Sequence, residues 1–194
     1  MENKKLFLLK TFLWWLPFAA IATIFAGLVY ISVQQVLRQG VNDPQIQIAE
    51  DMAAQLTSGQ NLQTVIPDNA LVVDIASSLA PYVVISDEQG QVIASLAELH
   101  NSAPVVPSGV FDSVRKYGEA RVTWEPEKGV RQALVMTHYQ SNGQSGFVMA
   151  GRSLREVEKR ETSMGVMAGI AWFISMVFCL ILVGFAVWFS NREK

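Results

Sequence analysis

Histidine and cysteine, two residue types that often act in catalysis and metal binding, are rare in this sequence and stand apart. His100 lies in a turn-like segment, His138 in a predicted strand, and Cys179, the single cysteine, in a long apolar segment. The sequence has no H-E-x-x-H, no G-x-S-x-G and no glycine-rich phosphate loop. One cysteine forms neither an intrachain disulfide nor a thiolate metal centre. We therefore expect no enzyme: no catalytic residue, no metal site and no cofactor.

Residues able to bind an anion recur on the predicted strands. Because side chains alternate between the two faces of a strand, Arg121, Arg131 and Tyr139 are expected on one face, with Tyr82 nearby. Two guanidinium groups beside a phenol suit a carboxylate, so these four are the candidate ligand-binding residues for a small molecule. Alternatively, the arginines pair with acidic neighbours on a solvated face: Glu119, Glu125 and Glu127.

Two apolar segments, residues 11–33 and 164–189, contain no charged residue. Each exceeds the roughly 20 residues that a helix needs to cross the hydrocarbon core of a bilayer. A cleaved signal peptide is the alternative for the first segment. Its apolar stretch is longer than the roughly 7–15 residues of such peptides, and no A-x-A site follows it. We therefore expect two transmembrane helices in contact with lipid.

Lysines and arginines flank the outer ends of this pair. Lys4, Lys5 and Lys10 precede the first segment, and Arg192 and Lys194 follow the second. An excess of Lys and Arg near membrane-spanning helices marks the cytoplasmic side, so both termini are expected in the cytoplasm. The segment between the helices, which has a small excess of acidic residues, is expected outside the cytoplasm. The expected organisation is a cytoplasmic N-terminus (1–10), two spans (11–33 and 164–189), an extracytoplasmic domain (34–163) and a cytoplasmic tail (190–194). The expected location is a bacterial inner membrane.

Small residues in both predicted spans can bring helices close together. Gly165 and Gly169 form a G-x-x-x-G pattern, and Ala19, Thr23 and Gly27 form a ridge on the first span. The pattern fits close approach of the two helices within one chain, or of two copies in a homodimer. The net charge of −2 gives no indication of nucleic-acid binding.

The segment between the spans changes from helical to alternating periodicity. Asp43 and Pro44 indicate a helix start after a break at "NDP", and the helix is expected to end near Thr57, before Gly59. A hairpin over residues 82–97, a short helix over 107–118 and three further strands between 120 and 152 follow. The residues from 69 to 80 are expected to be irregular or a short helix. Trp124 is expected to point into the core.

Five strands joined mostly by short turns predict an α+β domain, an antiparallel sheet with helices on one side. The stretches "YVVISDEQGQVIAS" and "GFVMAGRSLREVEKRE" resemble the Cache-like or PAS-like extracytoplasmic sensor domains of bacterial sensor histidine kinases and chemoreceptors. This resemblance implies a long N-terminal helix backing a five-stranded sheet between two transmembrane helices. It covers about residues 34–163 and names no ligand.

A continuous helix is predicted to join the last strand to the second span. Ser153 and Glu156 fit a capping box, and no proline lies between Leu154 and Phe189. Such a helix would measure roughly 54 Å at 1.5 Å per residue. It would couple the external domain to the membrane. The alternative is that the charged residues only mark the membrane boundary.

The resemblance and the two spans together favour a sensory, ligand-binding module in the cell membrane. The predicted tail, "SNREK", is too short for an output domain, so output is expected through a membrane-protein partner or self-association. Two alternatives stay open. One is a structural or assembly component of the bacterial envelope that binds another protein, and the other is a degenerate sensor kinase.

Overall fold

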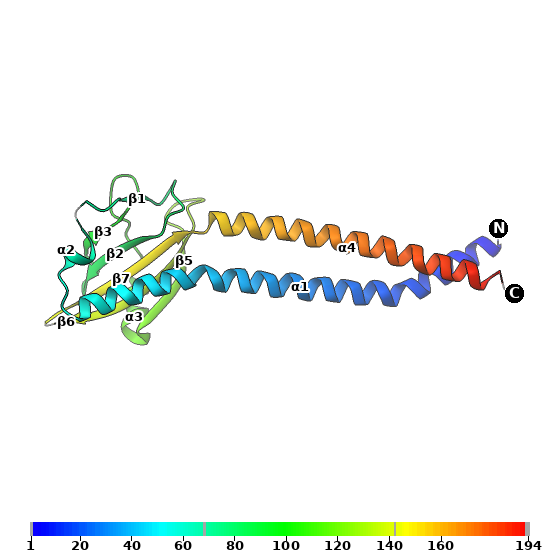
Figure 1. The fold of residues 1–194 in the computed structure, drawn as a ribbon, viewed down its shortest axis with the longest axis horizontal. Helices are drawn as coiled ribbons and strands as arrows, with labels where there is room; N and C mark the ends of the chain where they lie inside the picture. Colours follow the sequence, from blue (N-terminus) through cyan, green and yellow to red (C-terminus); the bar gives the residue numbers. More distant parts are fainter. Residues whose placement is uncertain (1, 68, 142, 193–194) are drawn as a thin grey trace. The chain divides into compact units, whose positions relative to one another are not determined.

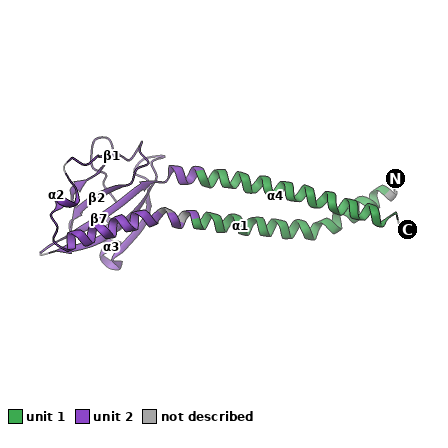
Figure 2. Ribbon diagram, in the orientation of Figure 1, with its two compact units in different colours: residues 1–36, 160–194 green, residues 37–159 purple. Residues whose placement is uncertain are grey.

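The computed structural model describes residues 2–67, 69–141 and 143–192, and the chain divides into two compact units (Figures 1 and 2). Unit 1 comprises residues 1–36 and 160–194, and unit 2 comprises residues 37–159. The regular elements in the described part of unit 1 are helices, whereas unit 2 contains the sheet.

Helix α1 (Glu2–Thr57) runs through Asp43 and Pro44 without interruption, so the predicted break and helix start there are wrong. Pro44 has no N–H to donate to the Gly40 carbonyl, and a proline inside a helix costs roughly 3 kcal/mol. The helix tolerates this loss because a long apolar segment precedes it and its C-terminal part packs on the sheet. Its end is as predicted, with Gly59 following at a φ of 86°.

Helix α4 (Arg155–Ser190) has 36 residues and is continuous, as predicted. Both α1 and α4 contain a stretch that is long and apolar enough to cross a membrane. Large apolar side chains are exposed along both helices, including Phe12, Phe25, Ile170 and Phe173. A hydrocarbon environment would cover such surfaces without further protein contacts.

Unit 2 is built on a five-stranded antiparallel sheet in the order β3-β2-β7-β6-β5. The strands are β2 (Tyr82–Asp87), β3 (Val92–Ser95), β5 (Glu119–Trp124), β6 (Gln132–Ser141) and β7 (Gln144–Ser153). The last strand therefore lies at the centre, between the first strand of the hairpin and β6 (Figure 1). The hairpin of β2 and β3 and the run of three strands, β5, β6 and β7, are as predicted.

Shorter elements complete unit 2. Helix α3 (Ser108–Tyr117) ends at Gly118, whose φ of 85° provides the left-handed C-cap, as the sequence predicts. Helix α2 (Leu62–Val65) follows α1. The segment before the sheet is irregular apart from β1 (Val73–Asp74), which pairs in parallel with β4 (Ala97–Glu98).

Helical elements cover both faces of the sheet, so the prediction of helices on one side is wrong. Phe111 and Val114 of α3 pack on one face with Val84, Leu134, Met136, Phe147 and Met149. Ala49, Ala53 and Leu56 of α1 pack on the other with Val83, Ile85, Val135 and Val148. Because β2, β6 and β7 are buried on both faces, polar and apolar residues do not alternate along them. Trp124 packs against the α3-side core and is partly buried.

Candidate functional site: a polar groove at one end of the sheet

The two candidate arginines are occupied by ion pairs. Arg121 is exposed and bonds to Glu119 beside it on β5. Arg131 bonds to Glu158 of α4, and its Nε lies 3.9 Å from the Glu125 carboxylate. The pairing of Arg121 with Glu119 and of Arg131 with Glu125 follows the solvated-face alternative. Glu127 instead lies 2.7 Å from His100.

The two candidate tyrosines lie on opposite faces of the sheet. Tyr82 belongs to the α3-side core and Tyr139 to the α1-side core. The Tyr82 ring lies over Gly151, where an added Cβ would come within 2.3 Å of it, so glycine is needed there. The four predicted residues are therefore not gathered into one site, and Tyr82 is separated from the arginines and Tyr139 by the sheet.

Tyr139 does line a groove, at the end of the sheet where β7 begins. The groove has a volume of about 960 Å³. Its walls come from the end of α1, the β2–β3 turn and the start of β7. The polar residues that line it are Gln60, Asn61, Asp87, Glu88, Gln89, Tyr139, Ser141, Gln144 and Ser145. The groove lies entirely within unit 2.

The Tyr139 side chain is the buried polar group of this groove. The residue is 7% exposed. Burial raises the pKa of Tyr139, and the nearby carboxylates of Asp87 and Glu88 raise it further. The phenol is thus a neutral donor in a negative field at ordinary pH.

The two carboxylates differ in how they are held. Asp87 Oδ1 accepts hydrogen bonds from the backbone N–H groups of Gln89 (3.0 Å) and Gln91 (2.7 Å), which fixes the β2–β3 turn. Glu88 lies 3.0 Å from His138 and 3.5 Å from Arg115. The hydrogen bond from His138 is the main reason that the pKa of Glu88 is lowered. Because the positive charge of Arg115 compensates the negative charge of Glu88, the carboxylate of Asp87 contributes most of the negative electrostatic potential at the groove.

These groups suit a small organic cation with hydrogen-bonding groups, rather than the carboxylate expected from the strand arginines. An ammonium group is attracted by Asp87, and side-chain amides and the phenol provide neutral partners. The site residues come from a helix end and two turns. Sequence periodicity does not predict that such residues form a site, because the order of the strands in the sheet brings them close together.

The opposite end of β7 contains a joint rather than a pocket. The Leu154 N–H donates to the Arg131 carbonyl (2.9 Å), and the Arg155 guanidinium donates to the Ser77 carbonyl (2.7 Å). Together with the Arg131–Glu158 pair, these bonds tie the first turn of α4 to the residue that precedes β6 and to the segment that follows β1. Arg131 is therefore a clamp on the helix.

The predicted cap of α4 is shifted by one residue. The Ser153 hydroxyl accepts from the Arg155 N–H at 3.4 Å, but Ser153 itself belongs to β7. The Leu154 carbonyl accepts the Glu158 N–H (2.9 Å), so Leu154 occupies the N-cap position.

In unit 1, tryptophans rather than glycines connect the two helices. Trp172 Nε1 donates to Thr23 Oγ1 (3.0 Å), and Trp15 Nε1 donates to the Met176 carbonyl (3.2 Å). An added Cβ at Gly165 would lie 3.5 Å from the Tyr30 ring, whereas one at Gly169 would meet nothing within 4 Å. Of the predicted G-x-x-x-G pair, only Gly165 lies against α1.

No protein-family model matches the chain, and no curated protein matches it. Among the described residues, no three of His, Cys, Asp and Glu gather as a set able to hold a metal ion.

Proposed function

We propose that this protein is a membrane-anchored sensory module. In this proposal α1 and α4 cross a bacterial cell membrane, both termini are cytoplasmic, and unit 2 stands outside and binds a small organic cation in the polar groove. Binding changes the sheet, and α4 carries the change across the membrane to a membrane-protein partner or to a second copy. The similarity of the sequence to Cache-like and PAS-like sensor domains supports the same function.

The observation that carries the proposal is the path of β7. This strand begins at the groove, occupies the centre of the sheet, and ends at Ser153, two residues before α4 starts. Its ten residues span roughly 30 Å at about 3.3 Å per residue. A central strand held by two neighbours transmits a displacement along its length, and the clamp at Arg131 passes it to the helix.

A panel of small molecules tests the binding step. The detergent-solubilised full chain is heated with primary amines, quaternary ammonium compounds and carboxylates of similar size, and the unfolding temperature is recorded. We expect stabilisation by at least one class of cation and none by carboxylates. Tyr139→Phe and Asp87→Asn should reduce the shift, whereas Arg121→Gln, outside the groove, should leave it unchanged. A shift produced only by carboxylates and removed by Arg121→Gln would contradict the proposal.

A protein-binding role in the envelope is the second candidate. Leu71 is 89% exposed and Val105 is 77% exposed, and both belong to unit 2. Exposed apolar side chains of this size are common in protein interfaces. If the protein acts by binding a partner protein, the double variant Leu71→Ser, Val105→Ser should no longer capture that partner. In the sensory role the double variant should keep the cation-induced shift.

A further inference from the structure

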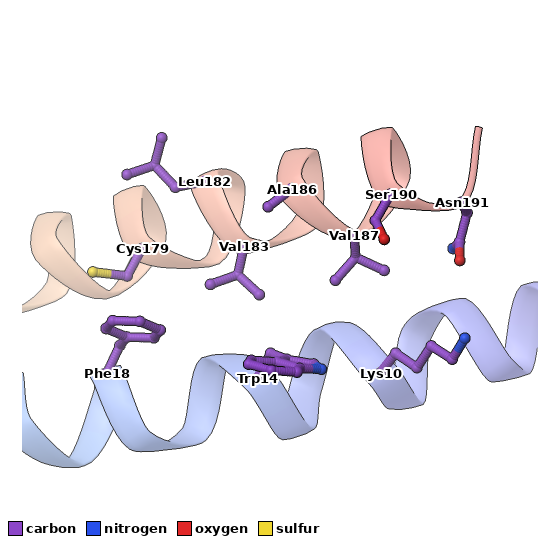
Figure 3. A pocket seen from close by; sticks show the side chains of 10 residues that line it. All are labelled: Lys10, Trp14, Phe18, Cys179, Leu182, Val183, Ala186, Val187, Ser190 and Asn191. Atoms are coloured by element: carbon purple, nitrogen blue, oxygen red, sulfur yellow. The ribbon is translucent and has the colours of Figure 1, made fainter. Parts of the chain in front are cut away.

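The two helices of unit 1 enclose a groove with a polar end (Figure 3). The groove has a volume of about 580 Å³. Trp14, Phe18, Cys179, Leu182, Val183 and Val187 supply most of its apolar walls. Lys10, Ser190 and Asn191 lie together at one end, and Phe18 and Cys179 lie at the other (Figure 3).

The dimensions of this groove match one chain of a lipid. Its lining residues on α4 extend from Cys179 to Ser190, which is roughly 16 Å at 1.5 Å per residue. One leaflet of a bilayer has a hydrocarbon thickness of roughly 15 Å, half of the 30 Å core. An acyl chain that enters beside Lys10 would therefore reach Cys179 near the middle of the bilayer.

The charge at the polar end selects the head group. Among the lining residues that the structure describes, Lys10 alone is charged, and Ser190 and Asn191 add hydrogen-bond donors. The expected orientation places this end at the cytoplasmic surface, where basic groups between helices attract anionic head groups. A phosphodiester without a compensating cation fits this end better than a zwitterionic head group.

We propose that the groove holds an anionic phospholipid of the surrounding bilayer, with its phosphate at Lys10 and one acyl chain between α1 and α4. This site rests on the membrane insertion contained in the proposed function but not on the sensory role. A lipid there would hold the two helices apart by the width of a chain, at the end away from the Thr23–Trp172 contact.

A second groove between the helices serves as an internal control. It has a volume of about 700 Å³ and is lined by Ala20, Phe173, Val177 and other mainly apolar residues. Among its described lining residues none is charged. Bulk lipid can fill this groove without selection by head group.

The test is retention of lipid by the full chain in mild detergent, measured by native mass spectrometry. Phosphatidylglycerol and phosphatidylcholine with identical acyl chains are offered in equal amounts. We expect preferential retention of phosphatidylglycerol, and a roughly fivefold weaker preference in Lys10→Gln. Lys5→Gln, which removes the same charge from α1 outside the groove, should keep the preference. Ala186→Trp should displace the lipid, whereas Ala20→Trp in the second groove should not.

Three outcomes would overturn the lipid site. Equal loss in Lys10→Gln and Lys5→Gln would indicate diffuse attraction to positive charge. Equal retention of both lipids would indicate no head-group site. A dimer that holds no lipid and that dissociates in the Ala186→Trp variant would show that a second copy of the chain fills the groove. Alkaline extraction of membranes separates these failures from failure of the membrane insertion on which the site rests, because only a chain that is not inserted would be released.

Discussion

Arg131 shows how a residue type can suggest the wrong role. An arginine on a strand beside a second arginine suggests anion binding, yet its guanidinium bonds to Glu158 and its backbone carbonyl accepts the Leu154 N–H. Both interactions reach the first turn of α4 from Arg131, the residue that precedes β6. The side chain contributes to the joint between sheet and helix, and its removal should affect transmission more than ligand affinity.

Tyr82 should make unit 2 sensitive to alkali. Burial raises the pKa of Tyr82, whereas in the unfolded chain the phenol ionises near pH 10. Above about pH 10 the unfolded state binds fewer protons than the folded state, so the free energy of unfolding falls as pH rises. Its contribution is complete below pH 10 and is lost progressively above it. Tyr82→Phe should flatten this decline without abolishing it, because the pKa of Tyr139 is also raised.

The same variant tests the burial of the Tyr82 hydroxyl. Within the described residues this hydroxyl is buried without a partner, and Tyr82 is 2% exposed. Removing an unpaired buried hydroxyl should be neutral or stabilising, by up to about 1 kcal/mol at pH 8. Urea unfolding followed by circular dichroism at pH 8 and above pH 10 measures both effects. Destabilisation by more than about 1 kcal/mol at pH 8 would contradict an unpaired hydroxyl.

At the scale of elements, Pro44 lies inside α1, in the part of the helix that belongs to unit 2. The helix loses one backbone hydrogen bond there but remains continuous. Pro44→Ala should therefore stabilise the protein, by up to roughly 3 kcal/mol, because it restores the N–H at an interior position. Pro107→Ala is the control, since Pro107 occupies the N-cap position of α3 and no interior helix bond is restored. Thermal unfolding of the full chain in detergent compares the two. Destabilisation by Pro44→Ala would indicate a real break in α1.

The sequence predicted the elements whose bounds depend on neighbouring residues alone, such as a proline-free run or a glycine at a helix end. The length of α4 follows from an uninterrupted run without proline, and Gly59 and Gly118 mark helix ends by their positive φ. The continuity of α1 could not be predicted, because the packing of Ala49 and Ala53 on the sheet offsets the local cost of Pro44. The groove could not be predicted either, since its walls meet only through the strand order.

At the scale of the whole molecule, the distribution of positive charge predicts a topology. A reporter that is active only in the cytoplasm should be active when it is fused after Lys194. A reporter that is active only outside the cytoplasm should be active when it is inserted at Gly143. Gly143 is exposed and lies between β6 and β7. Protease added to spheroplasts should cleave unit 2 and leave the two apolar helices protected. Protection of unit 2 from the protease would contradict the topology.

The central claim is that α4 carries movement of the sheet into the membrane. Cysteines at Thr23 and Trp172, in a Cys179→Ser background, report the contact between α1 and α4, because these side chains lie 3.0 Å apart. A short bis-maleimide should cross-link this pair in the parent. Two alanines inserted after Arg160 keep a helix but rotate its C-terminal part by roughly 200°. Two glycines at the same point should let α4 turn freely and recover the contact.

Cross-linking yield in membranes from these three proteins is the most direct measurement. We predict a high yield for the parent and for the two-glycine insertion, and a strongly reduced yield for the two-alanine insertion, with unchanged unfolding of unit 2 in all three. Equal cross-linking in both insertions and the parent would contradict the claim, because residues 155–160 would then only mark the membrane boundary.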